Sequence, residues 1–182
     1  MLKRLFDIGF SLFALIFSLP IIIITALLIK IEDFTEHIFF LQTRIGKDRI
    51  PFKIIKFRTM NSRITHEKEI TVDGDPRITK VGKWVRKLKF DELPQFINVL
   101  RGDMSIVGPR PEMKFIVKNY NEFELLRLKI KPGLTGTWQV SDTRNAPIHH
   151  NLDYDLHQIM YYSFSYNMKQ IINTILWATK GF

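Results

Sequence analysis

The sequence contains no cysteine among its 182 residues. This absence excludes disulfide bonds, thiolate zinc sites and cysteine nucleophiles, and it fits a reducing compartment. Internal repeats and low-complexity segments are also absent, so the chain is not a repeat protein. Acidic residues are fewer than basic ones: the chain has 18 Asp and Glu and 27 Lys and Arg, which gives a net charge of +9. Such a charge favours an anionic partner: nucleic acid, a phosphorylated substrate or a membrane surface.

A long apolar run lies near the N-terminus of a chain whose length suits one domain. Residues 5–29 are apolar apart from Asp7 and a few small polar residues. As a helix, this run can cross about 30 Å of hydrocarbon. A secretory signal is the main alternative, because Lys3 and Arg4 resemble its charged start. The run is longer than that of a signal and no cleavage site follows it. We therefore predict a membrane helix over residues 1–31.

The topology of this helix depends on Pro20, which lies well inside the run. Proline lacks an N–H group and its ring clashes with the carbonyl of Ile16, so a kink is expected. A helix that spans the membrane would place Lys3 and Arg4 on the side that the positive-inside rule disfavours. A re-entrant helix broken at Pro20 would keep Lys3, Arg4 and Lys30 on one side. Kinked spanning helices are common, so both topologies stay open, and the charges favour the re-entrant one.

The rest of the chain, residues 32–182, predicts an α+β domain that is mainly helical. A turn at residues 46–48 between short apolar runs predicts a small β-hairpin. A helix is expected over residues 81–88, because apolar residues recur there at helical spacing: Val81, Trp84, Val85 and Leu88. Lysine and arginine occupy its other faces. This amphipathic helix either packs on the core with a solvated basic face or lies on a membrane surface.

Further elements follow from pattern and composition. Helices are expected over residues 93–100 and 112–129, and residues 131–147 read as a loop rich in glycine and proline. The tail from residue 153 is aromatic and helical in pattern. Its aromatic side chains suit a membrane headgroup region as well as they suit a core.

Asp91 and Glu92 stand side by side just before Pro94, a residue that favours the first turn of a helix. Acids at a helix start are commonly simple caps, because the helix dipole favours their ionised form. An ionised aspartate can also bind Mg²⁺ or attack phosphorus. Phosphoryl chemistry needs cations as well, and Arg86 and Arg110 are near in sequence. Prolines on either side of Arg110 would hold its guanidinium for phosphate contact, although pairing with the nearby Glu112 is an alternative.

Three motifs carry a resemblance to a known family. They are KFRTM, DELPQFINVLRGDMSIVGPRPE and KPGLTGTWQV, in that order behind the apolar segment. The chain resembles the bacterial sugar transferases, the monotopic phosphoglycosyl transferases that act on polyprenyl phosphate. The resemblance runs from about Leu2 to Trp177. At this length the chain looks like the minimal catalytic form, without the extra N-terminal membrane helices of larger relatives.

The resemblance implies an activity and roles for particular residues. Family members transfer sugar-1-phosphate from a UDP-sugar to undecaprenyl phosphate and release UMP, the first membrane step of glycoconjugate assembly. By resemblance, Asp91 is the nucleophile that forms a covalent phosphosugar intermediate near a bound Mg²⁺, and Glu92 supports it. Lys56 matches the lysine of the first motif, Arg86 the basic residue ahead of the acid pair, and Arg110 the arginine of the GPRP turn. The family's re-entrant helix favours a break at Pro20, with the catalytic domain on the cytoplasmic face of the bacterial inner membrane.

The implied partners are a UDP-sugar, polyprenyl phosphate and membrane lipid, without nucleic acid. A second copy of the chain or downstream glycosyltransferases are left open. Two departures from the family stand out: Leu19-Pro20 replaces the usual Ser-Pro at the break, with Ser18 one position earlier. Lys131 replaces an arginine, which keeps the charge but loses the planar fork and leaves a phosphate role there in doubt.

Two other interpretations compete with the enzyme. A membrane-tethered module that binds nucleic acid or anionic lipid would explain the charge, but not the acid pair or the GPRP turn. Metal binding by His149, His150 and Asp153 is weaker, because adjacent histidines point in different directions and a third well-spaced ligand is lacking. The sequence does not identify the sugar, whose recognition we expect in the loops of residues 135–147.

Overall fold

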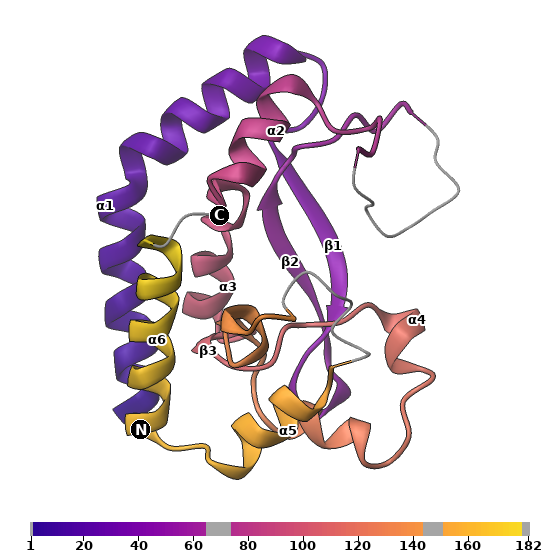
Figure 1. Ribbon diagram of the computed structural model, residues 1–182. Coiled ribbons are helices and arrows are strands. Elements are labelled where there is room, and N and C mark those ends of the chain that lie inside the picture. The colour runs from indigo at the N-terminus through magenta and orange to yellow at the C-terminus, as the bar shows by residue number, and fades with distance from the viewer. Residues whose placement is uncertain (1, 65–73, 144–150, 180–182) are drawn as a thin grey trace.

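The structure is a computed structural model that describes residues 2–64, 74–143 and 151–179. The described part is mainly helical, with two small two-stranded sheets (Figure 1). This confirms the mainly helical α+β class predicted from the sequence. In chain order the elements, with η marking a 3₁₀ turn, are α1 (Leu2–Glu32), β1 (Phe39–Ile45), η1 (Lys47–Arg49), β2 (Pro51–Phe57), α2 (Lys80–Lys87), η2 (Phe90–Glu92), α3 (Gln95–Arg101), β3 (Ser105–Val107), α4 (Lys114–Val117), η3 (Glu124–Lys129), β4 (Gly133–Thr135), η4 (Trp138–Val140), α5 (Asp153–Met160) and α6 (Phe164–Thr179).

The apolar run forms α1, which continues as one helix through Pro20. Figure 1 shows α1 as a curved helix along one side of the molecule. Pro20 cannot donate to the carbonyl of Ile16, and the Ser18 hydroxyl donates to the carbonyl of Ala14 at 2.6 Å. Proline in a helix and serine bonding of this kind both bend helices. The predicted break at Pro20 is therefore a bend within a continuous helix. Ser18, one residue before the position of the serine in the family's Ser-Pro, contributes to this bend.

Both ends of α1 rest on the same globular body. Near the start, Phe6 and Phe10 pack against a buried cluster made of Ile54, Val99, Met104, Ile106 and Val107. The buried Asp7 carboxylate accepts hydrogen bonds from the Ser105 hydroxyl and the Ile106 N–H, each at 3.1 Å. Near the end, the buried Ile29 packs with Phe57 and Val85. The helix is thus held to the domain along its whole length.

The opposite face of α1 is apolar and exposed. In the described part of the chain α1 is the one helix long and apolar enough to cross a membrane, and 17% of its most apolar stretch is buried. Its exposed large side chains are Leu2, Leu5, Leu12, Phe13, Ile16, Phe17, Leu19, Ile23, Ile24, Leu27, Leu28 and Ile31. An exposed apolar surface of this extent marks an interaction site, and lipid suits its composition.

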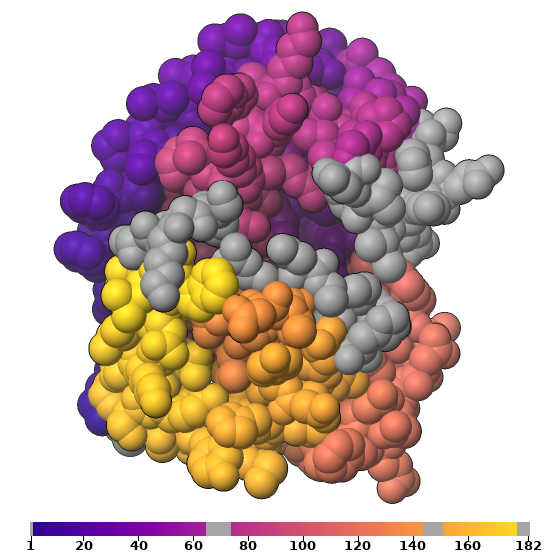
Figure 2. All heavy atoms as spheres, viewed as in Figure 1, coloured from indigo at the N-terminus to yellow at the C-terminus, as the bar shows by residue number. Residues whose placement is uncertain are grey.

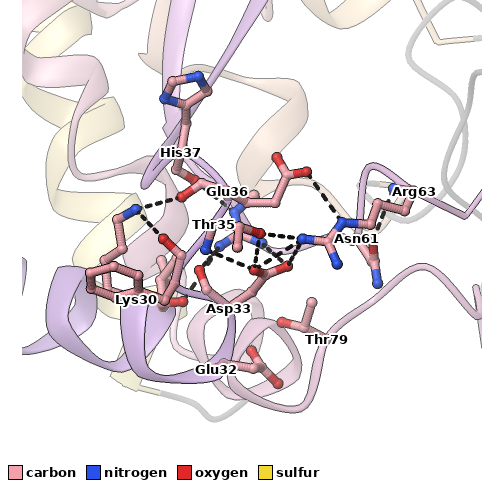
Figure 3. Close-up of polar contacts among 12 residues, drawn as sticks. Lys30, Glu32, Asp33, Thr35, Glu36, His37, Asn61, Arg63 and Thr79 are labelled. Atoms are coloured by element: carbon pink, nitrogen blue, oxygen red, sulfur yellow. Dashed lines mark hydrogen bonds and ion pairs between the residues drawn. The ribbon is translucent and has the colours of Figure 1, made fainter.

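The C-terminal end of α1 is fastened to the hairpin by polar contacts (Figure 3). Arg58, just after β2, donates to the carbonyls of Ile29, Asp33 and His37 at 3.4, 3.2 and 2.7 Å. The Asp33 carboxylate accepts from Thr35 and pairs with Arg63 at 3.3 Å. A guanidinium at a helix C-terminus satisfies carbonyls that have no partner within the helix.

The predicted hairpin is confirmed. Strands β1 and β2 pair antiparallel around the turn at η1, with Phe40 opposite Lys56.

The predicted helix at residues 81–88 is confirmed as α2, but only part of its apolar stripe is buried. Val85 is buried, whereas Trp84 is 65% exposed and Leu88 is 51% exposed. The core-packed interpretation therefore holds for only part of the stripe.

Helices α2 and α6 both lie beside α1. The ring of Phe164, at the start of α6, meets that of Phe6 with centroids 5.7 Å apart, and Val85 of α2 packs with Ile29. Figure 2 shows α2 and α6 on one face of the molecule, next to the edge formed by α1. Exposed apolar side chains also occur at the end of α2 and on α6: Trp84, Leu88, Ile172, Ile175 and Leu176.

Two sequence predictions are wrong. The helix expected over residues 112–129 is two short pieces, α4 and η3. Asn121 and Glu124 cap each other, because the N–H of each donates to the other's side chain, at 2.7 and 2.9 Å. The loop expected over residues 131–147 contains strand β4, which pairs in parallel with β3, and the turn η4. The predicted helices at residues 93–100 and in the tail are present as α3, α5 and α6.

Candidate active site

The acid pair lies on a short turn between two helices. Helix α2 ends before Lys89, whose φ of 58° is left-handed. Left-handed backbone is costly for a residue with a Cβ, so the junction between α2 and turn η2 is a constrained feature. Turn η2 then carries Asp91 and Glu92, and α3 begins after Pro94. The predicted position of the pair, just before a helix, is confirmed.

Glu92 is held by two cations from distant parts of the chain. Its Oε1 lies 2.9 Å from Lys56 Nζ on β2 and 3.2 Å from Arg110 Nη2. Burial by itself raises the pKa of Glu92, but the charges of Lys56 and Arg110 outweigh it and hold that pKa well below its usual range. Glu92 is therefore ionised near neutral pH and is committed to these two partners.

Asp91 has the opposite environment. Burial raises the pKa of the Asp91 carboxyl, and the adjacent Glu92 charge raises it further. The cations Lys56, Arg86 and Lys89 offset part of this effect. Among the described residues both ion pairs of the acid pair are made by Glu92, and Asp91 makes none. Its carboxylate is thus surrounded by positive charge without being bound to any of it.

Two buried donors near the acid pair have no hydrogen-bond partner within the described chain. They are Arg86 Nη1, in the last turn of α2, and Gln95 Nε2, in the first turn of α3. Gln95 stands three residues after Glu92 and four after Asp91, at the start of the helix that follows the acid pair. Buried donors normally have acceptors, so a ligand or water oxygen fits here. Sequence reasoning missed Gln95, although this spacing was the available signal.

Lys56 reaches Glu92 because a buried asparagine fixes strand β2 against α3. Asn98 Oδ1 accepts from the Ile55 N–H at 3.0 Å, and Asn98 Nδ2 donates to the Lys53 carbonyl at 2.8 Å and to Asp103 at 3.2 Å. Asn98 is fully buried. Sequence reasoning missed this residue, and an amide amid the apolar residues of α3 was the only hint.

The GPRP turn follows β3 and is held by backbone contacts with β4, the partner strand in the same sheet. Gly108 N–H donates to the Thr135 carbonyl and Gly133 N–H donates to the Pro109 carbonyl, both at 2.9 Å. A Cβ on Gly108 would meet the Lys131 carbonyl at 2.2 Å, so only glycine allows this close approach. The turn thereby points Arg110 at Glu92.

Arg110 does not pair with Glu112, which was the alternative left open by the sequence. Glu112 instead lies 4.0 Å from Arg44 Nη1, on β1. Burial and the charge of Arg110 lower the pKa of Arg44 to about 10. Arg44 is a further cation near the site that sequence reasoning did not single out.

One other sequence candidate, Lys131, lies elsewhere. The charges that act on Lys131 are those of Arg4, Asp7, Lys47 and Asp103, not those of the acid pair. Lys131 Nζ lies beside Gly102, near the start of α1. His149 and His150 fall outside the described residues. Within residues 2–64, 74–143 and 151–179 no cluster of three or more His, Cys, Asp or Glu could hold a metal by itself.

The structure thus brings Asp91, Glu92, Lys56, Arg86 and Arg110 together from three segments. One carboxylate is fixed by cations and its neighbour is unpaired among them. This charge arrangement suits an anionic substrate such as a phosphate ester, and it lies in a domain bound to an exposed apolar helix. These features indicate a class of protein: one that associates with membranes and acts on phosphate groups.

Comparison with known proteins agrees with this class. The family model described as "Bacterial sugar transferase" matches residues 1–181. The chain therefore belongs to the bacterial sugar transferase family, and the resemblance seen in the motifs is confirmed.

Named relatives from several bacteria match the chain. It is 38% identical to the UDP-N-acetylgalactosamine-undecaprenyl-phosphate N-acetylgalactosaminephosphotransferase of Aeromonas hydrophila, covering 100% of this chain and 44% of that protein. It is 37% identical to the UDP-glucose:undecaprenyl-phosphate glucose-1-phosphate transferase of Escherichia coli K12, covering 100% of this chain and 40% of that protein. It is 35% identical to the exopolysaccharide production protein ExoY of Sinorhizobium fredii, covering 95% of this chain and 83% of that protein. The chain therefore spans less than half the length of the first two relatives and most of the third.

Proposed function

We propose that this chain transfers sugar-1-phosphate from a UDP-sugar to undecaprenyl phosphate and releases UMP. The names of the Aeromonas and Escherichia relatives support the two substrate classes. The observation that carries the proposal is the contrast between two adjacent carboxylates. Glu92 is tied to Lys56 and Arg110, whereas Asp91 is unpaired among cations. A nucleophile needs a free lone pair, and Asp91 has one.

The reaction proceeds in two displacements at one phosphorus atom. In the first, an oxygen of the Asp91 carboxylate attacks the phosphorus that bears the sugar. The bond from that phosphorus to the bridging oxygen breaks, and UMP leaves with the electron pair. In the second, an oxygen of the lipid phosphate attacks the same phosphorus and displaces the Asp91 carboxylate. The aspartate is restored and the lipid carries the sugar diphosphate.

The surrounding cations stabilise the charge that develops on the phosphoryl oxygens. Arg86 has a buried donor without a partner, which a phosphate oxygen would satisfy. Arg110 can bind phosphate through its planar fork while it stays near Glu92. Lys56 contributes a positive charge and holds the Glu92 carboxylate in place. The negative charge next to Asp91 therefore has a fixed position.

A magnesium ion fits this site in combination with substrate. Mg²⁺ in such sites is bound through one or two carboxylates together with substrate phosphates. Asp91 offers the unpaired carboxylate, and the cations around it disfavour a metal until a diphosphate brings negative charge. Bound Mg²⁺ would neutralise diphosphate charge and make UMP a better leaving group.

The re-entrant topology belongs to the same proposal. Both ends of α1 contact one globular body, at Asp7 and at Ile29, so a bilayer cannot separate them while these contacts hold. This supports a helix that dips into one leaflet, and the proposal places residues 32–182 on the cytoplasmic face. Because the chain has no cysteine, single cysteines at Lys3 and Lys30 report the topology of the protein in sealed vesicles. Labelling of both from the same side is expected, and labelling from opposite sides would establish a full span.

The covalent intermediate has its own experiment. The protein is mixed with UDP-sugars and Mg²⁺ without lipid acceptor, and its intact mass is measured. We expect a sugar-phosphate adduct with the parent chain and none with Asp91→Asn, which keeps the size but not the charge. The matched control is Asp48→Asn, whose exposed carboxylate pairs with Lys47 in the hairpin turn rather than with the site. An adduct that survives in Asp91→Asn would show that the acid pair serves as a cap or metal ligand.

A further inference from the structure

A buried arginine connects the C-terminal helices to the active-site loop. The Arg127 side chain is 1% exposed and that of Asp155, on α5, is 0% exposed. Arg127 Nη2 lies 2.6 Å from Asp155 Oδ2 and donates to the carbonyl of Arg110 at 2.7 Å. Its Nη1 donates to the Tyr120 hydroxyl at 2.7 Å. One guanidinium thus joins three separate segments.

Arg110 faces the site on one side and this network on the other. Its side chain contacts Glu92, and its carbonyl accepts from Arg127. Backbone contacts from β4 hold the start of the turn at Gly108 and Pro109. In the described part of the chain the bond from Arg127 is the one that holds the Arg110 carbonyl itself. The orientation of the catalytic-site arginine therefore depends on where Arg127 lies.

Arg127 in turn depends on Asp155. A buried guanidinium without a counter-charge is strongly unfavourable, so loss of the carboxylate forces it to move or to take in water. The same Nη2 atom serves Asp155 and the Arg110 carbonyl, so such a movement is transmitted directly to the turn. Tyr120 holds the other nitrogen and limits how far the guanidinium can adjust.

We propose that Asp155 is a positioning residue of the transfer reaction, acting through Arg127 on Arg110. Helix α5, about 45 positions further along the sequence, is then part of the support of the active site. This inference rests on the proposed function for its kinetic consequence, whereas the geometric consequence stands without it. A displacement of about 1 Å in a substrate-binding group can cost about 10²-fold in rate.

A double-mutant cycle tests the proposal. Release of UMP is measured for the parent, Asp155→Asn, Arg110→Ala and the double variant, with separate kcat and KM for the UDP-sugar. We expect Asp155→Asn to lower kcat/KM by about tenfold to a hundredfold in the parent and to have little effect in the Arg110→Ala background. The control is Glu124→Gln, a half-buried residue on the same segment as Arg127 whose cap hydrogen bond is exposed to solvent, which should not change kcat/KM. An equal loss from Asp155→Asn in both backgrounds would overturn the proposal.

Hydrogen exchange supplies a readout that needs no activity. We expect faster amide exchange in the peptide that contains Arg110 for Asp155→Asn, and a smaller increase for Tyr120→Phe, which leaves the Arg127–Asp155 pair in place. Tyr120→Phe serves alone if Asp155→Asn does not fold. Unchanged exchange at Arg110 in the folded variant would refute the positioning role. If exchange is faster in Asp155→Asn than in the parent, but the parent releases no UMP from any UDP-sugar, the results count against the proposed function alone.

Discussion

Replacing Asn98 by alanine should destabilise the protein and displace Lys56, a residue of the proposed active site. The change removes three hydrogen bonds, to the Ile55 N–H, the Lys53 carbonyl and Asp103. At about 1 kcal/mol each, the loss is about 3 kcal/mol, and the buried Ile55 N–H is left without an acceptor. For a chain of this size that corresponds to a fall in melting temperature of about 6–12 °C. Lys56 follows Ile55 directly, so turnover should fall as well.

Thermal unfolding of the protein in lipid nanodiscs, followed by tryptophan fluorescence, measures this loss. The matched control is Asn119→Ala, because Asn119 is exposed and makes one side-chain hydrogen bond, to the Phe115 carbonyl at 3.3 Å. It should lower the melting temperature by no more than about 2 °C. A similar small change in Asn98→Ala would show that Asn98 does not clamp β2 to α3, and our account of how Lys56 is placed would be wrong.

Three further outcomes follow from the site and its supports. In the proposed mechanism Asp91 must be ionised to attack, and burial raises the pKa of its carboxyl, so activity should fall on acidification at a higher pH than for an ordinary aspartate. Glu92→Gln removes a neighbouring negative charge and should shift this acid limb of the pH–rate profile to lower pH, even though the plateau rate drops; an unshifted limb would mean that another group titrates. The kcat/KM of Arg110→Lys should be about tenfold higher than that of Arg110→Ala but below that of the parent, because an ammonium group keeps the charge and loses the bidentate geometry of the guanidinium. Equal rates in the two variants would show that the guanidinium has no role in the reaction. Gly82→Ala should lower the melting temperature by about 5 °C or more, because a Cβ there would meet the Thr59 carbonyl oxygen at 2.2 Å; a neutral result would show that α2 can shift freely.

Local pattern was sufficient for several elements and for the position of the acid pair. The turn at residues 46–48 predicted the hairpin, and the spacing from Val81 to Leu88 predicted α2. Pro94 placed the acid pair before α3. Each of these signals acts within a few residues. Sequence context had already indicated Arg110, and motif resemblance added Lys56; the fold brings Lys56 and Arg110 to Glu92 from 36 and 18 residues away.

The failures concern interactions between distant segments. Strands β3 and β4 have three residues each and pair in parallel, so no turn or alternation marks them. The helix predicted at residues 112–129 is interrupted where Asn121 and Glu124 cap each other and where Glu112 bridges to Ile45. Asn98 and Arg127 were missed for the same reason. A buried amide or guanidinium is recognised only once its partners are known.

The docking of α1 has a consequence for the order of events during synthesis. Asp7 obtains its backbone partner only when Ile106 is available, 99 residues later in the chain. At about 5–20 residues per second, α1 leaves the ribosome roughly 5–20 seconds before that partner. During this interval its apolar side chains have no protein surface to cover them, and only Lys3, one turn away at 3.8 Å, can compensate the Asp7 charge. In the proposed membrane arrangement, α1 would therefore reach lipid before the domain folds, and the domain would then close on a helix that is already in place.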